Sequence, residues 1–286
     1  MVSVVGTLLA LLVFFALFGV FLTQYVPLWM IDNESQFTSQ TQQAFAGLKS
    51  NMDLQAALNG PNVYATPFVM SSQGVPLIAQ PTQSLLNFVP RLPGVFANVS
   101  MTVGPGGGHA FYQNFSLGTL QMQLPNRYYS PQTFEFEDDA VIQSQADTQQ
   151  VLSFPPTLAF NQSGGQIGVT ISLVQMYGNA TQTVSVGTQE VYSHFLNTQT
   201  FTSTGRAGAA FNGQFRLGTH FPCAWANYLN GAMLRSGIGG AHYSLSPSTC
   251  AASNGQAQLI TLQFLGISSM TVILGQFTIV VGVGLG

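Results

Sequence analysis

The hydrophobic residues of this chain are concentrated first in one uninterrupted stretch, from Val2 to Val26. The stretch contains no charged residue, and its polar residues are Ser3, Thr7, Thr23 and Gln24. An α-helix of about 20 apolar residues is long enough to cross the hydrocarbon core of a bilayer. Because this helix is apolar on every side rather than along one stripe, lipid or a bundle of identical helices must surround it.

A second, amphipathic helical pattern follows Pro27. This proline removes one backbone donor and can kink a helix that continues past it, and Asp32 or Asn33 is a candidate cap for the second part. The apolar residues of this part recur on one helix face, at Phe37, Phe45, Leu48 and Met52. The Asn-Gly-Pro sequence at 59–61 predicts that the helix ends at about Leu58.

The rest of the chain has the pattern of short β-strands separated by Gly and Pro, with one helical interruption expected at Cys223–Leu234. Strands are expected at 63–70, 75–79, 85–89, 97–103, 108–124, 132–137, 167–176, 181–187, 190–196, 209–217, 258–266, 270–275 and 277–285. Many short strands with turn residues between them are typical of a β-sandwich. The predicted fold class is therefore α+β, with a long helical region at 1–60 and an all-β, sandwich-like head at 61–286.

The C-terminal stretch from Ser236 to Gly286 has no Asp, Glu, Lys or Arg, so a second membrane span is an alternative there. Gly266, Gly275 and Gln276 interrupt the stretch, and no uninterrupted apolar run of about 18 residues occurs. Two β-strands joined at Gly275-Gln276 are favoured.

Charged residues are unusually scarce. They make up 5% of the chain, against roughly 25% in typical globular proteins. With six basic residues and no basic patch, nucleic acid is excluded as a partner. Five N-x-[ST] sequences predict N-linked glycans, which would solubilise a surface with so little charge, at Asn33, Asn98, Asn114, Asn161 and Asn179.

The two cysteines, Cys223 and Cys250, favour one disulfide in an exported chain, and two buried free thiols are the alternative. We expect no metal and no cofactor, because the four histidines have no metal-ligand spacing.

The densest group of acidic residues is Glu135, Glu137, Asp138 and Asp139. Carboxylates so close together could bind Ca²⁺. We favour a half-buried strand that ends in a turn, since phenylalanines alternate with the two glutamates. No G-x-S-x-G sequence or other catalytic constellation occurs, so we expect a protein that is not an enzyme.

The N-terminal helix resembles that of archaeal type IV pilin-like proteins, in the stretch SVVGTLLALLVFFALFGVFLTQYVPLW. Two later blocks resemble recurring segments of archaeal surface proteins with a β-rich ectodomain: TPFVMSSQGVP at 66–76 and NRYYSPQTFEFEDDAVI at 126–142. The helix departs from bacterial type IV pilins, which carry a glutamate near the start of the mature helix.

The resemblance implies a pilin: a structural subunit of an extracellular filament that binds copies of itself, lies in the membrane before assembly and serves adhesion. The side chains that it implies for helix assembly are Val5, Leu8, Leu12, Phe15, Gly19 and Leu22.

The alternatives to a filament helix are a signal peptide and the anchor of a monomeric surface protein with a ligand-binding β ectodomain. A signal peptide has a basic start and a short apolar core, and membrane orientation usually depends on flanking Lys or Arg. No Lys or Arg precedes Lys49. Removal of a basic leader in front of Met1 would explain this, and we expect such a leader.

Overall fold

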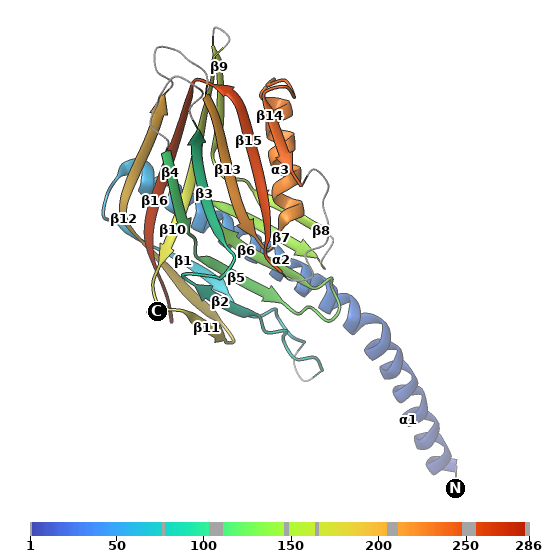
Figure 1. Cartoon of the computed structure of the whole chain (residues 1–286). Helices are drawn as coiled ribbons and strands as arrows, with labels where there is room; N and C mark the ends of the chain where they lie inside the picture. Colours follow the sequence, from blue (N-terminus) through green and yellow to red (C-terminus); the bar gives the residue numbers. More distant parts are fainter. Residues whose placement is uncertain are drawn as a thin grey trace.

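The structure, a computed structural model, describes residues 2–75, 78–102, 111–145, 149–163, 166–204, 211–247 and 256–283. It confirms the predicted fold class: one long N-terminal helix is followed by a head made of β-sheets. Figure 1 shows the helix leaving one end of the head and projecting well beyond it.

The helix is continuous from α1 (Val2–Val20) through a π-helical turn, η1 (Phe21–Tyr25), to α2 (Val26–Leu58). It ends where predicted, because Asn59 adopts the left-handed conformation, with φ of 48°, that commonly terminates helices. The expected cap at Asp32 or Asn33 is wrong, since the helix runs through both residues without an interruption.

The described strands form three sheets. The central sheet has the order β1 (Val63–Val69), β12 (Thr188–Thr204), β16 (Ser269–Val283), β10 (Gln166–Tyr177) and β9 (Leu158–Ser163). The lower sheet has the order β11 (Thr181–Val184), β2 (Leu85–Val89), β5 (Thr119–Leu124), β6 (Gln132–Glu137), β7 (Ala140–Gln145) and β8 (Gln149–Phe154). The upper sheet has the order β14 (Tyr243–Ser246), β15 (Gln258–Ile267), β13 (Phe211–Thr219), β3 (Phe96–Thr102) and β4 (Phe111–Ser116).

Two hydrophobic cores hold the head together, and strands β10 and β16 run through both. The first core lies between the central and upper sheets and includes Trp225 of helix α3 (Pro222–Arg235). The second lies between the central sheet, the lower sheet and helix α2, around Phe45, Phe68 and Phe134. The head is thus a sandwich extended at one end by a layer that packs on the long helix.

Most predicted strands are present, and α3 lies where the helical interruption was expected. No strand forms among the described residues of 75–79, while β7, β8, β9 and β14 were not predicted. The expected junction at Gly275-Gln276 is also wrong. Strand β16 continues through both residues because it pairs with β10 on one side and β12 on the other, and the break between strands falls at Ser268.

Candidate functional site

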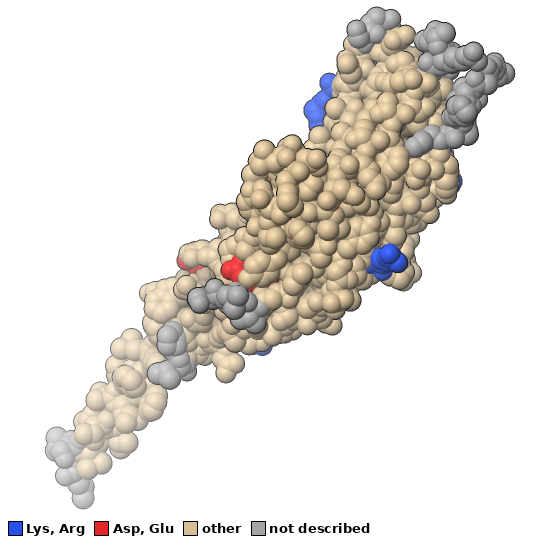
Figure 2. All heavy atoms as spheres, turned by 90° about the vertical axis from the view of Figure 1, so that its left-hand side faces the viewer, with Lys and Arg blue, Asp and Glu red and all other residues tan. Residues whose placement is uncertain are grey.

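The protruding part of the helix presents apolar side chains to every side. Each Val, Leu and Phe from Val4 to Val20 is exposed, with exposed fractions between 42% and 69%. Among the described helices, this one alone is long and apolar enough to cross a membrane. Figure 2 shows no charged atom on the protruding segment and only scattered ones on the visible face of the head.

The residues expected to mediate assembly lie on this segment. Four of them are large side chains that are more than half exposed: Val5, Leu8, Leu12 and Phe15. Gly19 and Leu22 are partly covered, and a Cβ added at Gly19 would meet no atom within 4 Å. Both Gly6 and Gly19 therefore leave room for a second helix to approach closely.

The π-helical turn explains how the helix passes Pro27 without ending. Proline cannot donate a hydrogen bond, and its ring collides with the carbonyl four residues earlier, here that of Thr23. In the turn, the Val26 amide donates to the Phe21 carbonyl, a five-residue step, and the Thr23 hydroxyl donates to the Gly19 carbonyl at 2.9 Å. The change from α-helical to π-helical hydrogen bonding in this turn therefore accommodates the proline without ending the helix.

The head begins to cover the helix at Val26. Beyond this point one face is buried at helical spacing, through Val26, Met30, Glu34, Phe37, Thr38, Thr41, Phe45, Leu48, Lys49, Met52 and Gln55. On the opposite side Tyr25 and Trp29 stay about half exposed. Such aromatic side chains are enriched where a helix leaves the apolar part of a membrane.

Glu34 is the one carboxylate on the buried face of the helix, and its exposed fraction is 0%. Its Oε1 accepts hydrogen bonds from the Thr82 hydroxyl at 2.7 Å and the Arg127 amide at 3.0 Å. Its Oε2 accepts from the amides of Tyr128 and Tyr129 at 2.8 and 2.7 Å. Each carboxylate oxygen therefore accepts two hydrogen bonds.

These hydrogen bonds decide the charge of the group. Burial alone raises the pKa of Glu34, but the bonds from Thr82 and from three backbone amides outweigh it and hold the pKa below its ordinary value. Glu34 is consequently ionised at neutral pH, and its charge fixes two loops on the helix.

We call these loops the collar, residues 71–75, 78–82 and 126–130. The Asn33 amide donates to the Gln73 carbonyl at 3.0 Å, and the Asn126 amide donates to the Thr38 hydroxyl at 3.3 Å. Both sequence blocks singled out above, 66–76 and 126–142, contribute residues to the collar. The collar packs on one face of the helix near the point where it enters the head.

A second group of charges lies farther along α2. Lys49 is buried and binds Asp139 at 2.7 Å and Asp53 at 3.1 Å. Asp138 and Asp139 form the two-residue turn between β6 and β7, and their φ angles of 50° and 62° are those of a hairpin turn that favours Asp. The turn predicted from the sequence is therefore present.

The interpretation of β6 as half-buried is wrong, because both faces of this strand are covered. Glu137 is completely buried and accepts a hydrogen bond from the Trp225 indole of α3 at 3.2 Å. Burial raises the pKa of Glu137 to about 7, although hydrogen bonds from Thr219 and Trp225 lower it. Burial also outweighs the attraction of Lys49 and raises the pKa of Asp139 to about 6.

The predicted glycosylation sites differ in accessibility. Asn114 on β4, Asn161 on β9 and Asn179 in a turn are exposed. Asn98 is buried on β3, and its amide donates to the Tyr112 hydroxyl at 2.7 Å. Asn33 is half-buried in the collar.

The predicted disulfide stays a prediction, because Cys250 lies outside the described residues; Cys223 is buried at the start of α3. Within the described ranges, no three His, Cys, Asp or Glu side chains are placed to hold a metal ion.

Comparison with protein-family models, with curated proteins and with solved structures finds no match. The resemblance to archaeal pilin-like proteins therefore rests on the sequence stretches given above.

Replacing Glu34 by Ala should destabilise the junction. The substitution leaves three backbone amides of the collar without an acceptor, and charge-assisted bonds contribute about 1.5–3 kcal/mol each. We expect the free energy of unfolding of the full chain in detergent micelles to fall by roughly 3 kcal/mol, measured by chemical denaturation. Asp32→Asn, an exposed change two residues away on the same helix, is the control and should alter stability little. Equal effects of the two changes would contradict the role of Glu34.

The buried carboxyl groups predict a dependence of stability on pH. Glu137 has a pKa of about 7 in the folded chain, against about 4.3 unfolded, so the folded state binds more protons between these values. Stability should therefore fall as pH rises from 5 to 8, by on the order of 1–3 kcal/mol from this group. In thermal unfolding, Glu137→Gln should reduce the dependence of the unfolding temperature on pH. Glu190→Gln, a half-buried change on β12, should not. A Glu137→Gln variant whose stability depends on pH as in the wild type would contradict the role given to Glu137.

Proposed function

We propose that this chain is the structural subunit of an extracellular filament of the archaeal type IV pilus kind, assembled through its N-terminal helix. The observation that carries the proposal is the exposure of every large apolar side chain from Val4 to Val20. Burying twelve such side chains would release tens of kcal/mol before entropy is subtracted. Lipid would supply the apolar surroundings before assembly, and neighbouring copies of the helix would supply them in the filament.

The connection between helix and head supports a filament. A simple membrane anchor needs only a flexible linker to its ectodomain, whereas this helix continues without a break into the head, where its buried face reaches Gln55. The four hydrogen bonds to Glu34 fix the collar on it. In a bundle of helices, such a junction would set the position of every head.

The heads would then form the outer surface of the filament. Asn114, Asn161 and Asn179 lie exposed on the head, and we infer that they carry glycans. A glycosylated surface with few charges fits contact with other surfaces and cells, so we propose adhesion as the role of the filament.

The competing hypothesis is a monomeric membrane-anchored surface protein with a ligand-binding ectodomain. It uses the same apolar helix, and a polar cavity of about 430 Å³ in the head favours it. The two hypotheses differ in one observable: only the filament requires contacts between copies of the helix.

Deleting residues 1–25 tests the assembly element. Since Val26 and Met30 already pack on the head, the shortened chain should stay folded, become soluble without detergent and remain monomeric in analytical ultracentrifugation. Electron microscopy should show filaments of the full chain only. Filaments of the same symmetry from the shortened chain would mean that the heads, and not the helix, drive assembly.

A charge in the middle of the helix provides the matched test in the full chain. Leu12→Asp should prevent filament formation in cells, because an aspartate is costly in lipid and in an apolar bundle alike. Leu58→Asp makes the same change at a leucine of similar exposure, 60% against 69%, but outside the apolar segment, and should leave filaments intact. Normal filaments from Leu12→Asp would refute the proposal that copies of this helix pack together in the filament.

The glycan prediction is tested by intact mass measurement of the chain from its native source. We expect a mass above the 30.5 kDa of the polypeptide, and Asn114→Gln, Asn161→Gln or Asn179→Gln should each remove one glycan. Asn98→Gln should change nothing, since this asparagine is buried. The bare polypeptide mass would rule out glycosylation.

A further inference from the structure

The six-stranded lower sheet has two faces of opposite character. Even-numbered residues such as Leu86, Met122 and Phe134 face helix α2 and the second core. Neighbouring odd-numbered residues of β2, β5 and β6 point away from it and are mostly polar. Strand pairing aligns two rows across the sheet. Asn87, Gln121 and Glu135 form one row, and Gln123 and Thr133 continue into Ser144 of β7 and Gln150 of β8 to form the other.

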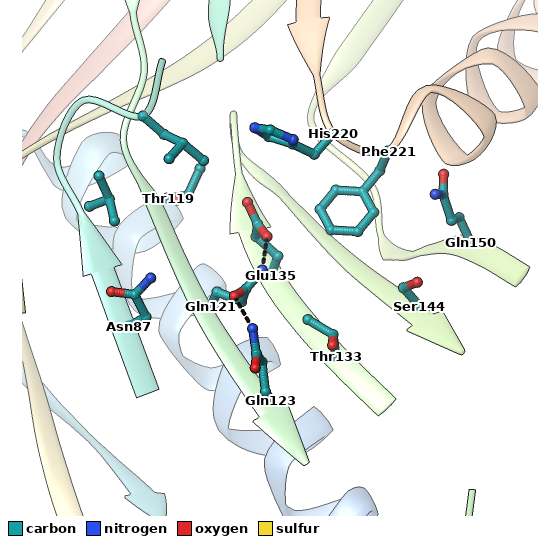
Figure 3. Close-up of a pocket in the computed structure, with 12 residues that line it drawn as sticks. Asn87, Thr119, Gln121, Gln123, Thr133, Glu135, Ser144, Gln150, His220 and Phe221 are labelled. Atoms are coloured by element: carbon teal, nitrogen blue, oxygen red, sulfur yellow. Dashed lines mark hydrogen bonds between the residues drawn. The ribbon is translucent and has the colours of Figure 1, made fainter. Parts of the chain in front are cut away.

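These rows line a cavity of about 430 Å³, which lies within the usual size range of roughly 300–1,000 Å³ for ligand sites. His220 and Phe221, which precede helix α3, form the opposite wall with Leu92. Figure 3 shows the polar side chains gathered over one side of the strands, with the Phe221 ring facing them. The cavity is therefore a polar floor with an aromatic wall.

A directed chain of amide groups ends at Glu135. The Gln123 amide donates to Gln121 Oε1 at 2.8 Å, and the Gln121 amide donates to Glu135 Oε2 at 2.8 Å. Glu135 is 2% exposed, and its second oxygen, Oε1, has no hydrogen-bond partner among the described residues. A buried carboxyl oxygen without a partner is costly in a folded protein, and this one belongs to a residue that lines the cavity.

The chemistry of the lining selects the class of ligand. Among its described lining residues there is no Lys or Arg, so the cavity lacks the side chains that most often bind a phosphate or a sulfate. Burial and the nearby Glu137 raise the pKa of Glu135 well above its ordinary value, which favours the neutral acid, a donor. Amides and hydroxyls both donate and accept, so the floor matches a ligand with several neighbouring hydroxyl groups.

We propose that this cavity binds a neutral saccharide, with its hydroxyl groups on Asn87 and Thr133 and its apolar ring face against Phe221. An extended peptide is the less suitable occupant, because peptides pair with sheet edges and this cavity lies on a sheet face. The inference is independent of the filament proposal, since it concerns the head alone.

The test uses the full chain in micelles of a detergent without a sugar headgroup. The probes are glucose, galactose, mannose, N-acetylglucosamine and their disaccharides, with binding followed by saturation-transfer NMR and calorimetry. Thr133→Val and Asn87→Ala should each weaken binding roughly three- to tenfold, the effect of one lost hydrogen bond. Thr183→Val is the matched control, because Thr183 pairs with Leu86 on the opposite face of the same sheet, and it should not alter binding.

Glu135→Leu separates a binding role from a structural one. If the amide chain that ends at Glu135 orients the floor of the cavity, this variant should weaken saccharide binding, and Glu135→Gln, whose side-chain oxygen can still accept from the Gln121 amide, should retain it. Unchanged saccharide binding in Glu135→Leu would overturn this positioning role of Glu135.

Two sources could supply the saccharide, and competition with glycans released from the native chain distinguishes them. Tighter binding of the released glycans would identify a glycan of a neighbouring copy, and tighter binding of the free sugars an external one; both support the site. Binding of no sugar at tens of millimolar, or of unstructured peptides in place of sugars, would refute it.

Discussion

The buried carboxylate of Glu34 joins two parts of the molecule that need opposite surroundings. Up to Val20 the helix exposes apolar side chains on all sides, and from Val26 onward one face packs on a β-sheet head. A charged group at such a boundary is stable only when hydrogen bonds replace the lost water, and three consecutive amides and a hydroxyl do this. The carboxylate thereby holds the two loops of the collar on one face of the helix.

Because the collar holds the helix, the second core can be built on it. Helix α2 supplies Phe37, Phe45, Leu48 and Met52 to that core, and the lower sheet packs its apolar face on them. The opposite face of the same sheet is then left free for polar side chains. Because successive side chains of a β-strand point to opposite faces, one face of the sheet packs on the helix and the other lines a cavity.

The acidic turn shows a different balance. Lys49 of the helix and Asp139 of the turn form a buried pair at 2.7 Å, yet Glu137 and Asp138 beside them have no cation of their own among the described residues. Their burial raises the pKa of both groups. This end of the second core is therefore most stable when carboxyl groups are protonated, whereas Glu34 requires its charge.

The sequence alone determined the elements with strong local signals. The apolar run from Val2 to Val26, the stop at Asn59 and helix α3 follow from composition, backbone preference and helical period. Most strands follow from short apolar runs between turn residues. The sequence could not assign Glu34, because its partners lie 48 to 95 positions away, and no local pattern marks a carboxylate that binds distant amides. Nor could it place Gly275-Gln276 inside a strand, since neighbouring strands β10 and β12 supply the hydrogen bonds there. The tertiary structure also decided that both faces of β6 are buried and that its polar row lines a cavity. Those outcomes depend on which layers pack together. The alternation of apolar and polar residues along a single strand does not contain that information.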